Sequence, residues 1–150
     1  MTRAHRRLLW HGILLFLLGL VTGLVVQQFR NPRLGLAAHL EGVMNGTFLL
    51  ALGAAWSHLR LSARAERLAF GVALYGTYAN WASTTLAAAL GTAVMTPIAS
   101  GVLKGQPWQE VLVGSGFASV GVAMLLASSL FLWGFRGRPV EEDRQEAGNG

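Results

Sequence analysis

The long apolar stretches of this chain contain a few polar side chains that could do chemistry. His39, Glu41 and Asn45 lie in the stretch 34–59. A second group lies in the stretch 68–103 and consists of Tyr75, Tyr78, Asn80 and Thr84, together with Ser83 and Thr85. A polar or ionisable group without a partner among apolar side chains costs several kcal/mol. These residues are therefore the candidates for a catalytic or binding site.

His39 is the first candidate, because imidazole is the commonest metal ligand and the side chain that titrates near neutrality without any perturbation. The alternative is a hydrogen-bonded histidine near the end of a helix, with no further role. His11 and His58 lie close to the ends of their apolar stretches. We expect both to be in contact with water and to have no role in a site.

Helical spacing divides the polar side chains of the stretch 34–59 between two faces. At 100° per residue, Glu41 and Asn45 lie within about 40° of each other, whereas His39 is about 120° from Asn45. A single pocket in one bundle would use neighbouring faces. The split predicts that His39 and Asn45 serve different cavities or opposite sides of a subunit boundary, which favours an oligomer.

The next helix carries a polar stripe of Gly76, Asn80 and Thr84, with Ser83 beside it and Tyr75 leading into it. Hydrogen bonding between helices would explain such a stripe without any catalytic role. Three hydroxyls, an amide and two phenols are more than packing requires, so we favour a site.

Glu41 has three possible roles. It could accept a proton in catalysis, hold the basic partner of a propionate-bearing cofactor, or pair with Arg33 near the outer surface.

The elements that position these residues follow from composition. The 150 residues are 53% apolar and 13% charged, and they include no cysteine. This excludes a separate soluble catalytic domain, a disulfide framework and a cysteine-based metal centre. No phosphate loop, HExxH pair, Ser/His/Asp set or nucleic-acid motif occurs. We predict an all-α, integral membrane four-helix bundle at 1–135, with spans near 8–28, 34–59, 66–94 and 108–135, and a disordered cytoplasmic tail at 136–150.

The basic residues predict the orientation of this bundle. Three arginines precede the first span, three lie between the second and third, and three follow the fourth: Arg3, Arg6, Arg7, Arg60, Arg64, Arg67, Arg136, Arg138 and Arg144. The other side has only Arg30, Arg33 and Lys104. The positive-inside rule therefore predicts a multi-pass membrane protein with both termini in the cytoplasm. Because the basic residues are explained by this orientation, we expect no nucleic-acid partner. The first apolar stretch is long for a signal peptide, so we expect it to be retained.

Helix boundaries follow from prolines and capping residues. Asn31-Pro32 is expected to close the first helix, Ser62 to cap the third, and Thr96-Pro97 to end the third before a flexible outer loop. Trp10, Trp56, Trp108 and Trp133 fall near span ends, as in an aromatic belt. Small residues should mark helix contacts at Gly19/Gly23, at Gly42/Gly46, and on the fourth helix at Gly114, Ala118 and Gly121-Val122.

Three short motifs resemble a known enzyme family. These are Asn31-Pro32-Arg33, the run Ala38-His39-Leu40-Glu41-Gly42-Val43-Met44-Asn45-Gly46, and Tyr78-Ala79-Asn80-Trp81. They resemble the hydroxylaminobenzene mutases, small integral membrane proteins of nitroarene degradation, and the similarity spans all four predicted helices. More distantly, they are similar to styrene oxide isomerase.

The resemblance implies a cofactor and an assembly. In styrene oxide isomerase the histidine of this motif binds haem b at a subunit boundary of a trimer, and the asparagine faces the substrate. The matching residues here are His39 and Asn45. The isomerase also uses a tyrosine and an acidic residue. By their spacing from Asn80, the position of the tyrosine holds Thr84 in this chain, and the position of the acidic residue holds Gly76. Glu41 is an acid that the isomerase motif does not obviously share.

From this resemblance we expect an isomerase of a bacterial inner membrane that converts a small aromatic hydroxylamine into 2-aminophenol by intramolecular hydroxyl transfer. Haem b held by His39 in a homotrimer would act as Lewis acid. Asn45 and Asn80 would orient the substrate, and Tyr75, Tyr78 or Glu41 would manage the proton. The alternatives are an epoxide isomerase of the styrene oxide isomerase type and a non-enzymatic haem-binding membrane protein.

Overall fold

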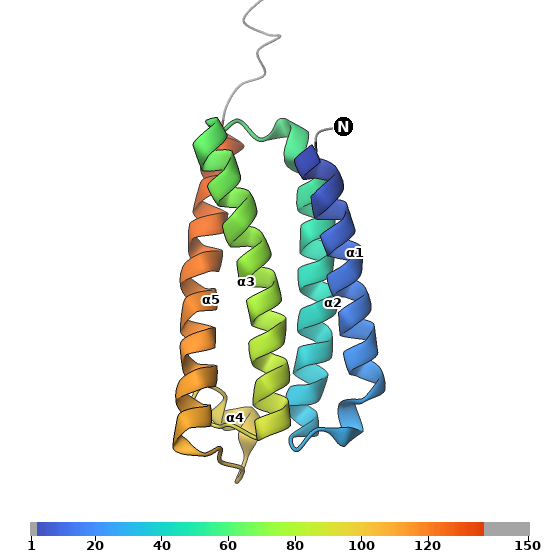
Figure 1. Ribbon diagram of the computed structural model, residues 1–150, viewed down its shortest axis with the longest axis vertical. Helices are drawn as coiled ribbons and strands as arrows, with labels where there is room; N and C mark the ends of the chain where they lie inside the picture. Colours follow the sequence, from blue (N-terminus) through green and yellow to red (C-terminus); the bar gives the residue numbers. More distant parts are fainter. Residues whose placement is uncertain (1–2, 137–150) are drawn as a thin grey trace, which may run out of the picture.

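The computed structural model describes residues 3–136 and consists of four long helices joined by short turns (Figure 1). The long helices are α1 (Arg3–Leu24), α2 (Pro32–Ala55), α3 (Ala63–Leu90) and α5 (Pro107–Gly134). No strand occurs in this part of the chain, which confirms the all-α prediction. The predicted tail lies outside the described residues except for Arg136.

The first turn differs from the expected one. Helix α1 ends at Leu24 instead of residue 28, and a short 3-10 helix, η1 (Val26–Gln28), follows it. Asn31-Pro32 begins α2 instead of closing α1. The Asn31 side chain accepts hydrogen bonds from the backbone N–H groups of Arg33 and Leu34, and Pro32 occupies the first turn, where its missing N–H costs nothing.

The second turn begins earlier than predicted. Helix α2 ends at Ala55, and the 3-10 helix η2 (Trp56–His58) replaces its expected last turn. Ser62 then caps α3 as predicted, since its hydroxyl accepts a hydrogen bond from the backbone N–H of Ala65. Arg60 N–H donates to the carbonyl of Gly134, which ties this turn to the end of α5.

The third helix ends earlier than Thr96-Pro97. Gly91 terminates α3 in the left-handed conformation, with φ of 67°, a geometry that glycine adopts without strain. The segment that we expected to be a flexible loop contains a helical turn, α4 (Pro97–Ser100). The carboxylate of Glu110, in the first turn of α5, accepts hydrogen bonds from the backbone N–H groups of Ala93, Val94 and Gly105. One acidic side chain thus holds both ends of this segment.

Consecutive long helices pack side by side in the order α1, α2, α3, α5 (Figure 1). The contact of α1 with α2 is the closest, as the paired glycines predicted. A Cβ atom added to Gly19 would lie 2.6 Å from the backbone nitrogen of Val43, and one added to Gly46 would lie 2.5 Å from that of Phe16. The predicted small face of α5 is different, because a Cβ atom at Gly121 would meet nothing within 4 Å.

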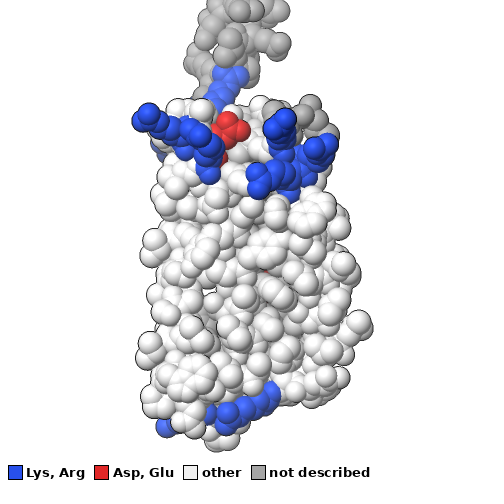
Figure 2. Space-filling model, viewed as in Figure 1, with Lys and Arg blue, Asp and Glu red and all other residues white. Residues whose placement is uncertain are grey.

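The ends of the molecule differ in charge. Figure 2 shows lysine and arginine gathered at the two ends, more of them at the end where α1 begins, with an uncharged band between. Helices α1 and α5 are long and apolar enough to cross a membrane. Trp10, Trp108 and Trp133 are exposed, as an aromatic belt requires. Trp56 is not part of such a belt, because it is 3% exposed and packs in the core.

Candidate functional site

The contact between α2 and α3 holds a carboxylate between two amides. The Oε2 atom of Glu41 accepts a hydrogen bond from Nδ2 of Asn45, at 3.1 Å, and another from Nδ2 of Asn80. Asn45 is buried, and Glu41 and Asn80 are partly buried. Among residues 3–136 the carboxylate forms no ion pair with Arg33, so that expected role of Glu41 is wrong. We call Glu41, Asn45 and Asn80 the amide–carboxylate cluster.

Helix geometry explains why these three side chains meet. Glu41 and Asn45 are four residues apart and therefore neighbours on one face of α2. Glu41 lies about 14 Å along α2 from Pro32, and Asn80 lies about 15 Å along α3 from Leu90. Because α2 and α3 are antiparallel and these two ends adjoin, the residues reach the same level. The cluster thus lies well inside the helical layer, away from both charged ends.

His39 lies on the other side of α2, against α1. Its Nδ1 atom is 2.9 Å from the backbone carbonyl oxygen of Gly19. A carbonyl only accepts, so Nδ1 carries the proton in this contact and Nε2 has the free lone pair. Within the described residues Nε2 has no hydrogen-bond partner. A Cβ atom at Gly23 would lie 2.7 Å from Nδ1, so this glycine leaves room for the ring.

The two-face prediction for α2 is confirmed within one chain. His39 contacts α1, whereas Glu41 and Asn45 face α3. The apolar side chains of Leu20 and Leu24 on α1 and of Leu36 and Leu40 on α2 are exposed on the same stretch of these two helices. His39 therefore lies at the edge of an apolar outer surface, and the amide–carboxylate cluster lies in a separate interior contact.

The two tyrosines do not join the cluster. The Tyr78 hydroxyl is 3.1 Å from Nδ1 of His11, on α1, and the two rings are in edge-on contact. His11 is partly buried, so our expectation that water surrounds it missed this partner. Tyr75 is 53% exposed, and its hydroxyl is 2.7 Å from that of Ser119 on α5. Neither tyrosine is hydrogen-bonded to Glu41, Asn45 or Asn80.

The polar stripe of α3 divides in the structure. The hydroxyl of Thr84 donates to the carbonyl oxygen of Asn80, one turn back in the same helix. Gly76 accommodates Met124 of α5, whose sulfur would lie 2.6 Å from an added Cβ atom. Thr84 thus contacts the backbone of a cluster residue, and Gly76 serves the packing of α3 on α5.

Trp81 and Thr22 were not anticipated as partners. The indole N–H of Trp81, on α3, donates to the hydroxyl of Thr22, on α1, at 3.1 Å. Trp81 Cδ1 would lie 3.0 Å from a Cβ atom at Gly42. The indole therefore crosses α2 where that helix has no side chain. The small residue of α2 and the tryptophan after Asn80 were the sequence signals for this contact.

Comparison with known proteins gives a consistent assignment. The family described as styrene oxide isomerase matches residues 4–136. Hydroxylaminobenzene mutase HabB of Ectopseudomonas oleovorans is 50% identical over 92% of this chain and 85% of its own length. Hydroxylaminobenzene mutase HabA of the same organism is 43% identical over 82% of this chain and 92% of its own length. No solved structure matches the chain. The chain therefore belongs to the styrene oxide isomerase family, a family of isomerases.

Proposed function

We propose that this isomerase converts an arylhydroxylamine, with hydroxylaminobenzene as the type substrate, into the 2-aminophenol. The N–O bond breaks, a C–O bond forms at the ortho carbon, the ring loses a proton there and the nitrogen gains one. Substrate and product are isomers, so no oxidant or reductant is consumed. The names of the relatives HabB and HabA support this substrate. The observation that carries the proposal is the carboxylate of Glu41 held between two amides.

This cluster can perform the proton transfer that the rearrangement needs. A carboxylate accepts a proton. The two amides that donate to Oε2 fix the orientation of the Glu41 carboxylate. The proposed role of Glu41 is to take the proton from the ortho carbon after the oxygen has moved. Asn45 and Asn80 hold Glu41 and orient the substrate oxygen. An apolar surrounding keeps water away from the electron-poor ring, so that the released oxygen recombines with it.

The surroundings of His39 fit a haem b group. Histidines that bind a metal usually donate their other ring N–H to a carbonyl or carboxylate, and the contact of Nδ1 with Gly19 has this form. In the described part of the chain no three His, Cys, Asp or Glu side chains gather to hold a bare metal ion. One imidazole beside exposed leucines suits a porphyrin, which brings four nitrogen ligands of its own. Ferric haem would supply a Lewis acid for the hydroxylamine oxygen.

The separation of the two faces supports a site shared between copies of the chain. Within one copy, helix α2 stands between His39 and the amide–carboxylate cluster. A neighbouring copy packed on the exposed apolar surface beside His39 would bring its own residues to that imidazole. We propose a homotrimer in which His39 of one copy and the cluster of the next act on one substrate.

The proposed location is a bacterial inner membrane, crossed by all four long helices. Helices α1 and α5 support this by length and composition. The end where α1 begins carries Arg3, Arg6, Arg7, Arg60, Arg64, Arg67 and Arg136, against Arg30, Arg33 and Lys104 at the other. The positive-inside rule assigns the richer end to the cytoplasm.

Product analysis tests the proposal. Membranes containing the protein are given phenylhydroxylamine or styrene oxide, and the products are identified. We expect 2-aminophenol from the first substrate. A carbonyl isomer from styrene oxide, with phenylhydroxylamine unchanged, would instead support an epoxide isomerase, which the family match at 4–136 makes the second candidate.

A further inference from the structure

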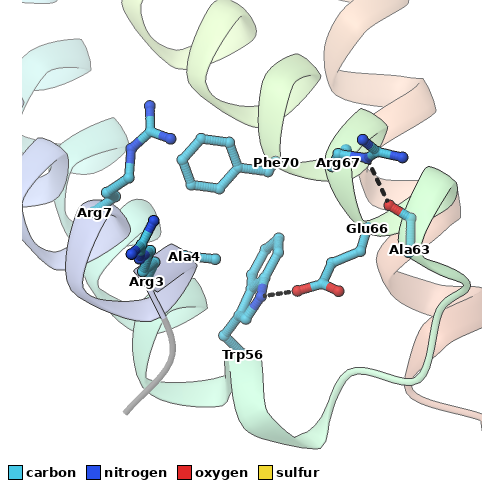
Figure 3. A pocket seen from close by; sticks show the side chains of 8 residues that line it. All are labelled: Arg3, Ala4, Arg7, Trp56, Ala63, Glu66, Arg67 and Phe70. Atoms are coloured by element: carbon cyan, nitrogen blue, oxygen red, sulfur yellow. Dashed lines mark hydrogen bonds between the residues drawn. The ribbon is translucent and has the colours of Figure 1, made fainter.

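A pocket of about 340 Å³ opens at the arginine-rich end of the molecule, away from the amide–carboxylate cluster (Figure 3). Three segments form it: the first turns of α1 and of α3, and the short helix η2. Figure 3 shows Arg3 and Arg7 on the α1 side, Glu66 and Arg67 on the α3 side, and the rings of Trp56 and Phe70 between them. None of these residues has a role in the proposed isomerase.

The pocket carries an excess of positive charge. Three arginines line it against one acidic residue, Glu66, whose Oε1 accepts a hydrogen bond from the indole N–H of Trp56 at 2.8 Å. The guanidinium of Arg7 lies 4.9 Å from the centre of the Phe70 ring, and Nε of Arg67 donates to the carbonyl of Ala63. Among residues 3–136 no carboxylate forms an ion pair with these arginines. Three guanidinium groups are therefore available to an anion.

The walls of the pocket are apolar below these charges. Trp56 is buried, Phe70 is partly buried, and Ala4 and Ala63 complete the lining. The arginine-rich end that holds the pocket borders the uncharged band of the surface (Figure 2). A ligand that fills it needs an anionic group for the arginines and an apolar part for the rings.

We propose that this pocket binds the phosphate group of an anionic phospholipid from the cytoplasmic leaflet. Arginine is suited to phosphate because its planar fork donates two parallel hydrogen bonds. Basic pockets between helices on the cytoplasmic side bind anionic headgroups, and that leaflet is rich in them. The inference goes beyond the proposed reaction and rests on the membrane orientation proposed above. Inorganic phosphate shares the anionic chemistry but lacks the apolar part.

Native mass spectrometry of the detergent-purified full chain tests the site. The protein is titrated with short-chain phosphatidylglycerol, with phosphatidylcholine of the same chain length, or with sodium phosphate. We expect one phosphatidylglycerol bound per chain, at an affinity at least about tenfold above that for phosphatidylcholine. Equal binding of both lipids would overturn the proposal. Inorganic phosphate that displaces the lipid completely at equal concentration would overturn the lipid as ligand.

Charge-matched variants separate this pocket from general attraction. The pocket variant combines Arg3→Gln, Arg7→Gln and Arg67→Gln; the control combines Arg6→Gln, Arg60→Gln and Arg64→Gln, at the same end but outside the pocket. We expect the pocket variant to lose at least about tenfold in affinity and the control less than about twofold. Equal losses would refute the site. Arginine-to-lysine replacements in the pocket keep the charge and guard against misfolding; they should show an intermediate loss. The pocket variant and the control variant should both retain arylhydroxylamine turnover. A negative result for lipid binding therefore leaves the proposed reaction standing.

Discussion

Glu41 of α2 and Asn80 of α3 are hydrogen-bonded across the helix contact although 39 residues separate them in the chain. The same carboxylate oxygen also accepts from Asn45, one turn further along α2. Two amide donors on one oxygen orient the carboxyl group and join two helices at one point. This arrangement makes Glu41 the residue on which the proposed proton transfer depends.

Replacing Glu41 by Gln should lower kcat for 2-aminophenol formation by about 100-fold or more, since general-base catalysis contributes that much and an amide does not take the proton. The measurement uses detergent-solubilised protein at equal concentration. The matched control is Glu66→Gln, which alters another hydrogen-bonded carboxylate, far from the cluster. It should leave kcat within about twofold. A Glu41→Gln enzyme as active as the control would refute the assigned role.

Replacing His39 by Ala should remove the Soret absorbance of protein expressed with ample haem, because the proposed axial ligand is lost. Turnover should fall further than in Glu41→Gln. His58→Ala serves as control, since that imidazole is exposed at the charged end. A wild-type protein that is active without a Soret band would remove haem from the mechanism. In that case Glu41→Gln should abolish turnover and His39→Ala should not.

Co-expression of His39→Ala with Glu41→Gln tests the shared site. If His39 of one copy works with the cluster of the next, random mixing leaves about a quarter of the boundaries with both residues intact. Trimers that contain both variants, purified through a different tag on each, keep about a third of their boundaries intact. They should therefore recover about a third of wild-type activity, although each variant alone is nearly inactive. Hybrids no more active than their parents would show that each site lies within one copy.

Replacing Gly19 by Ala should destabilise the fold by about 1–3 kcal/mol, the usual cost of overpacking a close contact. The added Cβ atom would lie 2.6 Å from the backbone nitrogen of Val43. A backbone atom cannot move aside as the end of a flexible side chain can. Gly121→Ala is the matched control, because nothing lies within 4 Å of the new atom. Thermal unfolding in one detergent compares the two. Equal melting temperatures would contradict the described contact of α1 with α2.

Replacing Tyr78 by Phe should cost about 0.6 kcal/mol of stability, the average worth of a hydrogen bond between membrane helices. The hydroxyl contacts His11 and not the amide–carboxylate cluster. We therefore expect kcat to change less than about fivefold, far less than in Glu41→Gln. Tyr75→Phe, which removes the contact with Ser119, provides the comparison. A large loss of kcat in Tyr78→Phe alone would assign the proton transfer to that phenol.

The chain by itself determined the features that depend on near neighbours. The apolar stretches predicted four long helices, and Ser62 marked the start of α3 because capping is decided within one turn. The angular separation of His39 from Asn45 followed from helical periodicity alone. The paired glycines at Gly19 and Gly42 indicated a close helix contact, since only small residues let two backbones approach.

Only the tertiary structure decided which helix each of these faces meets. It gave Glu41 the partner Asn80 instead of Arg33, paired His11 with Tyr78, and buried Trp56. It also brought Trp81 across Gly42 to Thr22. Periodicity fixes the angle between two side chains on one helix, but the rotation of that helix against its neighbours comes from the packing of all of them together. Partners distant in sequence follow from that packing.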